Sequence, residues 1–482
     1  MSGGRDDGAL ALVLHSHMPY VEGFGTWPFG EEWLWEAVAS VYLPLLDVLD
    51  GAPVTLGLTP VLCDQLETLP GPAGERLLAF MRAVRATIHE EDAAALDAAG
   101  EPELAAELRR AAGEYARADA ALERSRDLLG ALRSLSGVEL WTSAASHALL
   151  PMLATDAGLR CQLGTGIASH LRRFGRFGGG LWLPECGYVP GLERLLGEHG
   201  VRTFCVDQTA ARGLGAPEQL EPVRTPAGPV AVPVDWETIS LVWGDEGYPS
   251  HPAYRDYHRR TVHDLKPWTN AGGPYRPAEA DAVAGEQARD FVARARERLA
   301  RYAAERRRPG LLCCALDTEL LGHWWYEGGV WLAAVLAEAR DQGLEFVTVS
   351  EGLARVPLAE RSLLASTWGT GKDFSTWDSP AVAEIAFTAR RAELRTLAAA
   401  GRRHGPRAAL ERAARELLAL QASDWAFQLT RSLAADYPLE RVRGHAAAHD
   451  AALAALEDSA PAPEPTLGNL APDLDLTSLL VP

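Results

Sequence analysis

Short apolar runs, each long enough for one buried strand, recur along the chain and are separated by stretches with helical periodicity. Such runs are typical of parallel strands that are covered on both faces. Parallel neighbours need crossover segments, and Glu32–Leu49 and Glu286–Glu305 have the amphipathic spacing for that role. The pattern predicts an α/β fold, most simply a distorted (β/α) barrel. Its candidate strands are Ala9–Leu14, Val54–Leu58, Val138–Thr142, Gly180–Pro184, Thr203–Val206, Leu311–Leu316 and Glu345–Val349.

Two regions are too long and too rich in helix-forming residues to be single crossovers. Residues 76–135 are dense in Ala, Leu, Glu and Arg and predict a helical insertion. The stretches 381–400, 408–427 and 439–456 have the same character and predict a C-terminal helical domain. We therefore expect a barrel over residues 1–350 that includes the insertion, a helical domain over 351–460, and a Pro- and Asp-rich tail over 461–482.

Composition limits the partners of this chain. A formal net charge of −19 disfavours nucleic acid, because phosphate backbones are bound by clustered Lys and Arg. No segment reaches the roughly 20 apolar residues that span a bilayer, and the N-terminus lacks the pattern of a signal peptide, so we expect a cytoplasmic protein that binds no membrane. The six cysteines lack a C-x-x-C spacing and are predicted to be buried free thiols. We expect a monomer or a small homo-oligomer.

Two carboxylates directly follow candidate strands. Glu185 lies in Leu181-Trp182-Leu183-Pro184-Glu185, and Asp317 ends the run Leu311–Leu316. In a parallel barrel, residues at the C-terminal ends of strands meet in one mouth, so distant acids can converge on a single substrate. Pairs of this kind cleave glycosidic bonds. The alternative for Glu185 is a cap on the helix that follows, but its rigid aromatic neighbours favour a binding site.

His15 and His17 stand where the first candidate strand ends, and strand alternation directs both side chains to the same face. An H-x-H pair here is compatible with a metal site, with hydrogen bonds to substrate hydroxyls, or with packing in the core. A barrel metal site usually adds further histidines or a lysine at other strand ends. His147 and His323 are available, but no lysine is. We expect substrate contact and no metal.

Several of the 14 tryptophans lie near polar strand ends or turns. Sugar rings stack their C–H faces on aromatic side chains, so these residues are predicted sugar-binding platforms, with packing in the core as the alternative for each one. Asp207 ends another strand and is expected in the polar wall, while the aromatic loop at 236–257 has the composition of a lid. The predicted platforms are Trp27, Trp141, Trp243, Trp268, Trp324, Trp368 and Trp377.

Taken together, these motifs resemble glycoside hydrolase family 57, and the similarity covers nearly the whole chain. Residues 25–30 and the loop that carries Trp368 and Trp377 most resemble the branching enzymes of that family. The motifs are His15-Ser16-His17-Met18-Pro19, the stretch 141–147, Trp182-Leu183-Pro184-Glu185-Cys186-Gly187-Tyr188, Asp317-Thr318-Glu319-Leu320-Leu321-Gly322-His323-Trp324-Trp325 and Gln421-Ala422-Ser423-Asp424-Trp425.

The resemblance implies a (β/α)7 barrel and a retaining mechanism that needs no metal or organic cofactor. It implies that Glu185 is the nucleophile and Asp317 the general acid/base, acting on α-1,4-glucan and forming α-1,6 branches. Tyr248 matches a loop tyrosine linked to transfer, and Trp268 stands where the family's branching enzymes carry a longer aromatic segment. The other implied substrate-binding residues are His15, His17, Trp27, His147, Asp207, His323, Trp368, Trp377, Asp424 and Trp425.

Other functions fit parts of the same pattern. Water competes with a sugar hydroxyl as acceptor, so an amylase-type hydrolase and a 4-α-glucanotransferase remain alternatives. A metal-dependent barrel hydrolase built on His15 and His17 is a more distant one. A glucan-binding protein without catalysis would keep the aromatic platforms and tolerate the loss of Glu185.

Overall fold

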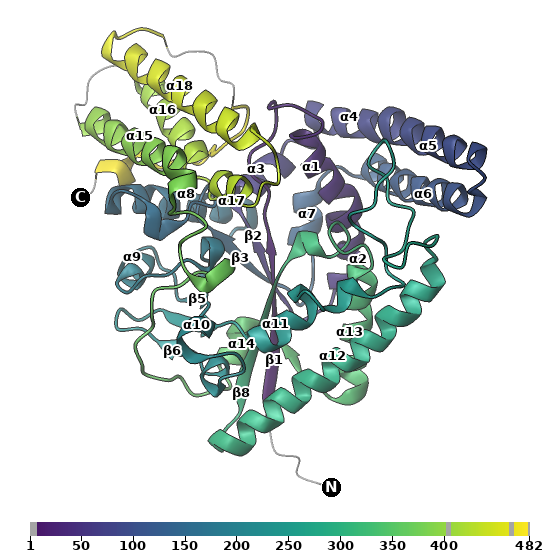
Figure 1. The fold of residues 1–482 in the computed structure, drawn as a ribbon. Helices are drawn as coiled ribbons and strands as arrows, with labels where there is room; N and C mark the ends of the chain where they lie inside the picture. Colours follow the sequence, from purple (N-terminus) through teal and green to yellow (C-terminus); the bar gives the residue numbers. More distant parts are fainter. Residues whose placement is uncertain (1–6, 402–405, 462–466, 481–482) are drawn as a thin grey trace.

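The computed structural model describes residues 7–401, 406–461 and 467–480, and its centre is a mainly parallel sheet that curls into a barrel (Figure 1). The strands follow the order β6-β7-β5-β4-β3-β2-β1-β8. The ring closes between β7 and β8, and this junction is the seam of the barrel. Just after β7, the Asp235 amide donates to the Cys313 carbonyl on β8 at 2.8 Å, and no ladder like those between the other neighbouring strands joins the two among the described residues. The seven barrel strands are β1 (Gly8–Ser16), β2 (Thr55–Leu58), β3 (Glu139–Ser143), β4 (Gly180–Trp182), β5 (Thr203–Val206), β7 (Val230–Pro233) and β8 (Gly310–Asp317).

The longest ladder of the barrel joins β1 to β8. The strands pair in parallel register from Gly8 opposite Gly310 to His15 opposite Asp317. Their residues are apolar and buried on both faces, as expected for strands enclosed by helices. This register places His15 directly beside Asp317 at the C-terminal edge of the sheet.

Six of the seven predicted runs form barrel strands, and the seventh forms a short parallel strand outside the ring. The run at 345–349 gives only the two-residue strand β9 (Phe346–Val347). It pairs with Leu10 and Ala11 of β1, whereas β2 pairs with β1 from Val13 onward. The true seventh strand, β7, was missed because Pro229 and Pro233 bracket its short apolar core and resemble loop signals. It also carries a small antiparallel partner, β6 (Val223–Arg224).

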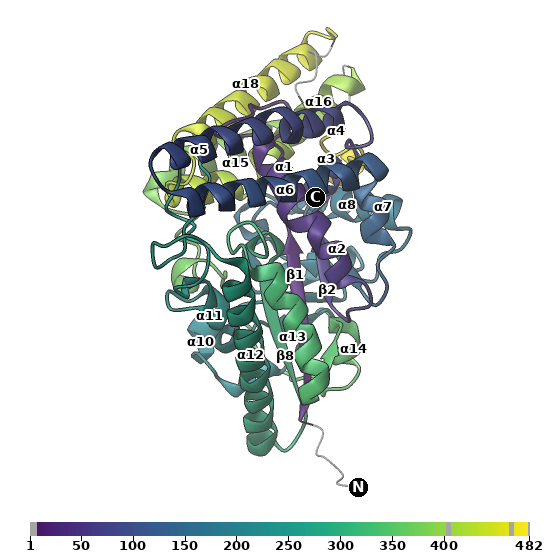
Figure 2. The same ribbon diagram turned by 90° about the vertical axis from the view of Figure 1, so that its right-hand side faces the viewer.

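Helices enclose the barrel, and both predicted crossovers are present. The first runs through α1 (Glu31–Ala37), a π-helical turn (Val38–Tyr42) and α2 (Leu43–Leu49). The second is part of α12 (Pro277–Arg306), which lies along the outer side of the barrel (Figure 2). The other enclosing helices are α3 (Pro60–Leu66), α8 (Asp156–Phe174), α9 (Leu192–Glu198), α10 (Thr209–Arg212), α11 (Trp236–Trp243), α13 (Gly328–Gln342) and α14 (Val349–Leu353).

Two groups of helices stand over the end of the barrel opposite the N-terminus (Figures 1 and 2). The predicted insertion forms α4 (Pro72–Ala79), α5 (Ala86–Ala98), α6 (Pro102–Arg124) and α7 (Leu128–Arg133). The C-terminal group contains α15 (Ala383–Gly401), α16 (Arg407–Leu420), α17 (Asp424–Thr430) and α18 (Tyr437–Glu457). The C-terminal edges of the strands therefore open between two helical layers.

The stretch 408–427, which predicted part of the C-terminal helical domain, is helical but interrupted. Helix α16 ends at Leu420 and α17 begins at Asp424. In the gap, Ala422 forms a β-bridge with Ala148 and the Ser423 amide donates to the His147 carbonyl at 3.1 Å. Pairing with the loop after β3 thus replaces helical hydrogen bonds and brings the turn to the barrel mouth.

The described part of the C-terminal stretch, 467–480, packs against the barrel. Leu467 and Leu470 are buried in a cluster with Tyr20, and the Ala471 amide donates to Asp64 Oδ2 at 2.7 Å. The predicted tail also includes 462–466 and 481–482, which lie outside the described residues.

All six cysteines are buried and free, as predicted. Over the described ranges, none of the helices combines the length and the hydropathy that a membrane span requires.

Candidate active site

Glu185 sits in an unusual backbone conformation just after β4. Its φ is 60° and that of Cys186 is 50°, the left-handed region that side chains other than Gly rarely adopt. The Glu185 carbonyl accepts a hydrogen bond from the Trp368 amide at 2.9 Å, which holds this turn against the loop at 366–377. Such strain persists only where the surroundings fix it, and it is concentrated at functional sites.

The Glu185 carboxylate is held by two donors from distant parts of the chain. Trp368 Nε1 donates to Oε2 at 3.0 Å, and Ser423 Oγ donates to Oε1 at 2.9 Å. Burial raises the pKa of Glu185, while these two hydrogen bonds oppose the rise by stabilising the charged form. The net shift is upward. The carboxylate is therefore fixed in orientation, with only 13% of its side chain exposed.

Asp317 ends β8, beside His15. Burial raises the pKa of Asp317 well above its usual range, and the negative charges of Glu319 and Glu185 raise it further. The two acids are linked through histidines. His15 is opposite Asp317 in the β1–β8 register and 3.0 Å from His147, and His147 Nδ1 lies 3.8 Å from Glu185 Oε1. Two acids with different surroundings, one stabilised as an anion by two donors and one pushed towards its neutral form, are the pattern of a nucleophile and an acid.

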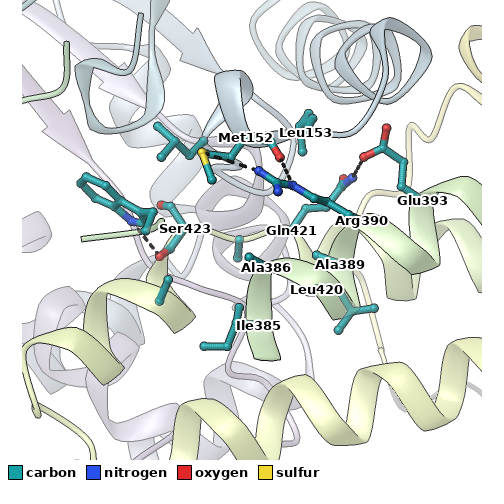
Figure 3. Close-up of a pocket in the computed structure, with 14 residues that line it drawn as sticks. Met152, Leu153, Ile385, Ala386, Ala389, Arg390, Glu393, Leu420, Gln421 and Ser423 are labelled. Carbon is teal, nitrogen blue, oxygen red and sulfur yellow. Dashed lines mark hydrogen bonds between the residues drawn. The ribbon is translucent and has the colours of Figure 1, made fainter. Parts of the chain in front are cut away.

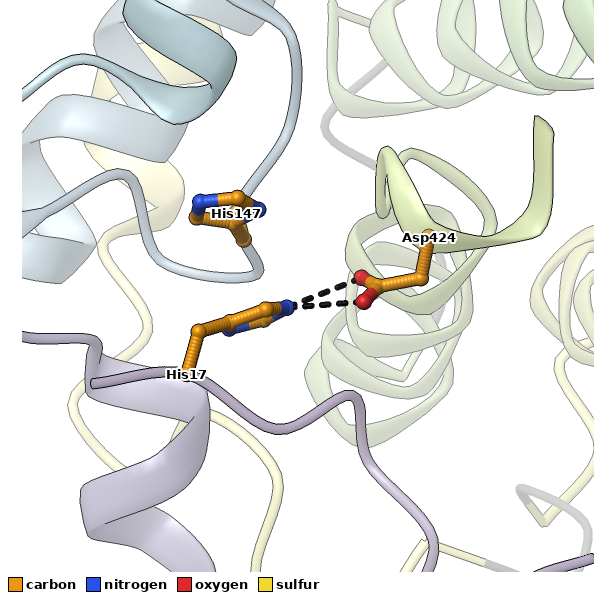
Figure 4. Close-up of side chains that lie close together, drawn as sticks. All are labelled: His17, His147 and Asp424. Carbon is orange, nitrogen blue, oxygen red and sulfur yellow. Dashed lines mark hydrogen bonds and ion pairs between the residues drawn. The ribbon is translucent and has the colours of Figure 1, made fainter. Parts of the chain in front are cut away.

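Three histidines line the wall between these carboxyl groups. His15 Nε2 and His147 Nε2 are 3.0 Å apart, and burial, followed by the charge of His17, lowers the pKa of each well below its usual value. Both are therefore neutral. His17 is also subject to burial, which lowers its pKa, but Asp424 and other nearby carboxylates outweigh that effect and the net pKa is raised. His17 Nε2 lies 2.9 and 3.0 Å from the Asp424 oxygens (Figure 4).

His17, His147 and Asp424 are close enough to be considered as metal ligands, with one donor atom of each within 4.8 Å of the others. The rings of the two histidines are stacked with centroids 3.9 Å apart and planes 21° from parallel, so their in-plane lone pairs do not converge on one ion (Figure 4). All four ring nitrogens already have partners: Thr59 and Asp424 for His17, and Ser423 and His15 for His147. This donor set does not fit a metal.

Two polar residues of the site were quoted in sequence motifs but given no role. Ser423 contacts Glu185 directly. Glu319 accepts hydrogen bonds on Oε1 from the His17 amide, at 3.0 Å, and from the Tyr42 hydroxyl. Burial raises the pKa of Glu319 to about 7. The sequence could have pointed to both residues, because Ser423 directly precedes Asp424 and Glu319 follows two residues after Asp317, and both of these acids were predicted site residues.

The predicted aromatic platforms divide into open and closed ones. Trp27 is 65% exposed, and Trp243 and Trp324 are each 39% exposed, with ring centroids 5.9 Å apart. Trp368 is partly exposed and packs edge-on against Trp182.

Three of the predicted platforms are not open faces, contrary to expectation. Trp141 is 1% exposed. Trp425, for which no open face was predicted, is also 1% exposed, and its Nε1 donates to a backbone carbonyl of α16. Trp377 is 4% exposed and its Nε1 donates to the Ser423 carbonyl at 3.2 Å. Trp268 is 8% exposed and has the Arg259 guanidinium over its ring. Large rings stabilise the loops here by burial, which sequence cannot distinguish from stacking on sugar.

Asp207 and Tyr248 also have roles that differ from expectation. Asp207 is fully buried and pairs with Lys372 Nζ at 3.0 Å, so it anchors the loop that carries Trp368 and does not form an open polar wall. The Tyr248 hydroxyl donates to Asp290 on α12 at 2.7 Å and is thus engaged by an outer helix, not by the carboxylate pair.

His323 is half-buried next to Trp324, and burial, with the charge of Lys266, lowers the pKa of His323 to about 4. It is therefore neutral in the physiological range. Its position follows β8, as does that of Asp317, but no hydrogen bond ties it to the carboxylate pair among the described residues.

Comparison with known proteins identifies the family of this chain. The model of glycosyl hydrolase family 57 matches residues 115–362, and a model described as the C-terminal region of 1,4-alpha-glucan branching enzyme matches residues 388–472. A probable 1,4-alpha-glucan branching enzyme of Mycobacterium tuberculosis is 34% identical over 491 residues, which cover 92% of this chain and 90% of that protein.

Archaeal relatives show the same similarity. A 1,4-alpha-glucan branching enzyme of Thermococcus kodakarensis is 32% identical and aligns over 91% of this chain and 72% of its own length. The crystal structure of a GH57-type branching enzyme from Pyrococcus horikoshii superposes with a TM-score of 0.89 at 30% identity, covering 98% of this chain and 97% of that one.

Proposed function

Since this chain belongs to glycosyl hydrolase family 57, we propose that it converts linear α-1,4-glucan into a branched polymer, as 1,4-alpha-glucan branching enzymes do. It is an enzyme of α-glucan metabolism, and proteins named 1,4-alpha-glucan branching enzyme match it along nearly its whole length. The resemblance inferred from its motifs is confirmed at the level of family and activity. The residue roles below are our assignment.

The proposed reaction is a double displacement at one anomeric carbon. Glu185 attacks C1 of the donor glucan while Asp317 gives its proton to the departing 4-oxygen, which releases the reducing-end fragment and leaves a glycosyl-enzyme ester. Asp317, now a carboxylate, removes the proton from a 6-hydroxyl of an acceptor glucan. The resulting oxygen attacks C1, the ester bond to Glu185 breaks, and an α-1,6 branch is formed with retained configuration.

The observation that carries the assignment is the unequal environment of the two acids. Glu185 accepts one hydrogen bond on each oxygen, which favours the ionised form that a nucleophile requires. Asp317 has a pKa raised by burial and by neighbouring negative charge, which favours the protonated form that a general acid requires. Each acid is thus in the state that the first step needs.

The histidine wall suits a neutral sugar. The imidazoles of His15 and His147 are neutral and His17 is already paired with Asp424, so none of these groups requires a charged ligand. The exposed rings of Trp27, Trp243 and Trp324 provide flat apolar faces for further glucose units.

Product analysis tests the function and the nucleophile together. Wild type and Glu185→Gln are incubated with amylose, the products are debranched enzymatically, and new α-1,6 ends are counted alongside reducing ends. We expect branches from wild type and none from Glu185→Gln. Glu198→Gln on α9, where an exposed Glu pairs only with arginines, is the matched control and should behave as wild type.

Other outcomes would replace the proposal. Reducing ends without branches would indicate an amylase-type hydrolase, and lengthened linear chains would indicate a 4-α-glucanotransferase. Unchanged branching by Glu185→Gln would show that the nucleophile is wrongly assigned. The expected cytoplasmic location and oligomeric state remain predictions.

A further inference from the structure

Ser423 is tied to the barrel by its backbone as well as by its hydroxyl. Its amide donates to the His147 carbonyl at 3.1 Å, and its carbonyl accepts from Trp377 Nε1 at 3.2 Å. Its side chain reaches Glu185 Oε1 at 2.9 Å and His147 Nδ1 at 2.9 Å. The turn between α16 and α17 therefore holds one hydroxyl between a histidine and the proposed nucleophile.

The protons along these contacts can point in only one direction when Glu185 is ionised. A serine hydroxyl has a single proton, and because it is donated to the carboxylate, Ser423 Oγ must accept from His147 Nδ1–H. Neutral His147 then has a bare Nε2, so the contact at 3.0 Å requires His15 Nε2–H as donor. Neutral His15 is left with a bare Nδ1.

His15 Nδ1 is the atom at the far end of these contacts, and it is buried without a hydrogen-bond partner among the described residues. With Glu185 ionised, this atom is a bare acceptor; with Glu185 protonated, every proton along the contacts reverses and the same atom carries an N–H. The direction of the chain therefore follows the ionisation of Glu185, and the ionised form is the one that a nucleophile requires.

We propose that Ser423 is a positioning residue for Glu185, and that His15, His147 and Ser423 form a directed chain of hydrogen bonds that keeps this carboxylate ionised and oriented. The inference rests on the proposed function of Glu185. Through this chain, a residue of the C-terminal helices completes a site whose acids lie in the barrel.

The cavity beside Ser423 supplies a conservative variant. Ser423 lies at one edge of an apolar cavity between residues 149–153 and helices α15–α17, with Ile385, Ala386 and Leu420 on its other walls (Figure 3). Because Ser423 borders this cavity, Ser423→Thr is the variant that keeps the hydroxyl, whereas Ser423→Ala removes it.

The first test is the pH profile of kcat/KM for α-1,4 cleavage of amylose by wild type, Ser423→Ala and Ser423→Thr. The acid limb reports the ionisation of the nucleophile in the free enzyme. Loss of a hydrogen bond to a charged acceptor should move that limb up by about one pH unit in Ser423→Ala, a tenfold loss on the acid side. Ser423→Thr should restore the limb, and the basic limb should not move.

A matched control separates this effect from general loss of a buried hydroxyl. Ser169→Ala on α8 removes a buried hydroxyl that bonds Arg173, and it should leave both limbs in place. Coincident acid limbs for wild type and Ser423→Ala would overturn the inference, as would an equal shift in Ser169→Ala or a failure of Ser423→Thr to restore it.

A second measurement does not depend on catalysis. Carboxyl-¹³C NMR of glutamate-labelled protein, with Glu185→Gln to assign the resonance, follows the ionisation of Glu185 directly. Ser423→Ala should raise its midpoint by about one pH unit, and Ser423→Thr should return it. An unchanged midpoint would refute the chain even if wild type failed to act on amylose, while failure of wild type on amylose alone would refute the proposed function.

Discussion

Trp368 offers a clean way to test how the Glu185 carboxylate is controlled. Its Nε1 donates to Oε2 at 3.0 Å, and its ring packs edge-on against Trp182 with centroids 4.9 Å apart. Trp368→Phe removes the N–H while keeping an aromatic face for packing and for contact with sugar. The substitution therefore separates the hydrogen bond from any stacking of glucan on this ring.

The size of the effect follows from the charge on the acceptor. A hydrogen bond to an ionised group contributes about 1.5–3 kcal/mol, and each pKa unit corresponds to about 1.4 kcal/mol. Because the bond stabilises only the charged form, its loss raises the pKa of Glu185 by about one to two units, in the same direction as burial already does. The nucleophile then becomes protonated at a higher pH.

The assay is the pH dependence of amylose cleavage, followed by loss of iodine staining. We expect the acid limb of kcat/KM to move up by about one to two pH units in Trp368→Phe, with a loss of about 10- to 100-fold on the acid side and little loss on the plateau. Trp331→Phe is the control, because its buried Nε1 has no hydrogen-bond partner within the described part of the chain, and it should not move the limb. An acid limb in the wild-type position would refute the reasoning, whatever happened to the plateau.

Two further substitutions test the other polar contacts. Glu319→Gln keeps an oxygen that can accept from His17 and Tyr42 but removes a negative charge that raises the pKa of Asp317. Glu319 has a pKa of about 7, so its charge acts mainly above that pH, and its loss should move the basic limb of kcat/KM to lower pH. A basic limb in the wild-type position would contradict this reasoning. Lys372→Met leaves the buried carboxylate of Asp207 unpaired and should lower the free energy of unfolding by about 3–5 kcal/mol in denaturant titration. Adding Asp207→Asn should recover part of that loss, and an additive double variant would argue against the ion pair.

The barrel was largely predictable from sequence, because buried parallel strands leave a strong apolar signal. Runs of that kind located six of the seven barrel strands, and their ends located Glu185 and Asp317. β7 escaped because two prolines flank a four-residue strand at the seam, where ladder hydrogen bonds are few and proline is tolerated. Local signals thus fail where the sheet itself is weakest.

The supports of the site were harder to predict, for a different physical reason. The turn at Ser423 interrupts a stretch with good helical periodicity, and only pairing with Ala148 in the distant loop after β3 makes the break favourable. The left-handed backbone of Glu185 is likewise fixed by Trp368, far along the chain. Contacts of this range have no counterpart in local propensity. The buried rings of Trp268 and Trp377 show the converse error, since composition cannot tell a core ring from an open one.

The proposed site depends on segments that follow the barrel in the chain. The barrel contributes both acids, but both hydrogen bonds to the Glu185 carboxylate come from residues beyond 350, through Trp368 and Ser423. Asp424, in the same turn as Ser423, holds His17 and raises its pKa. A barrel without these segments would keep its acids but lose the donors that oppose the effect of burial on Glu185. Because burial alone favours the neutral carboxyl group, the removal of these donors is expected to shift Glu185 towards its protonated form, which cannot act as the proposed nucleophile.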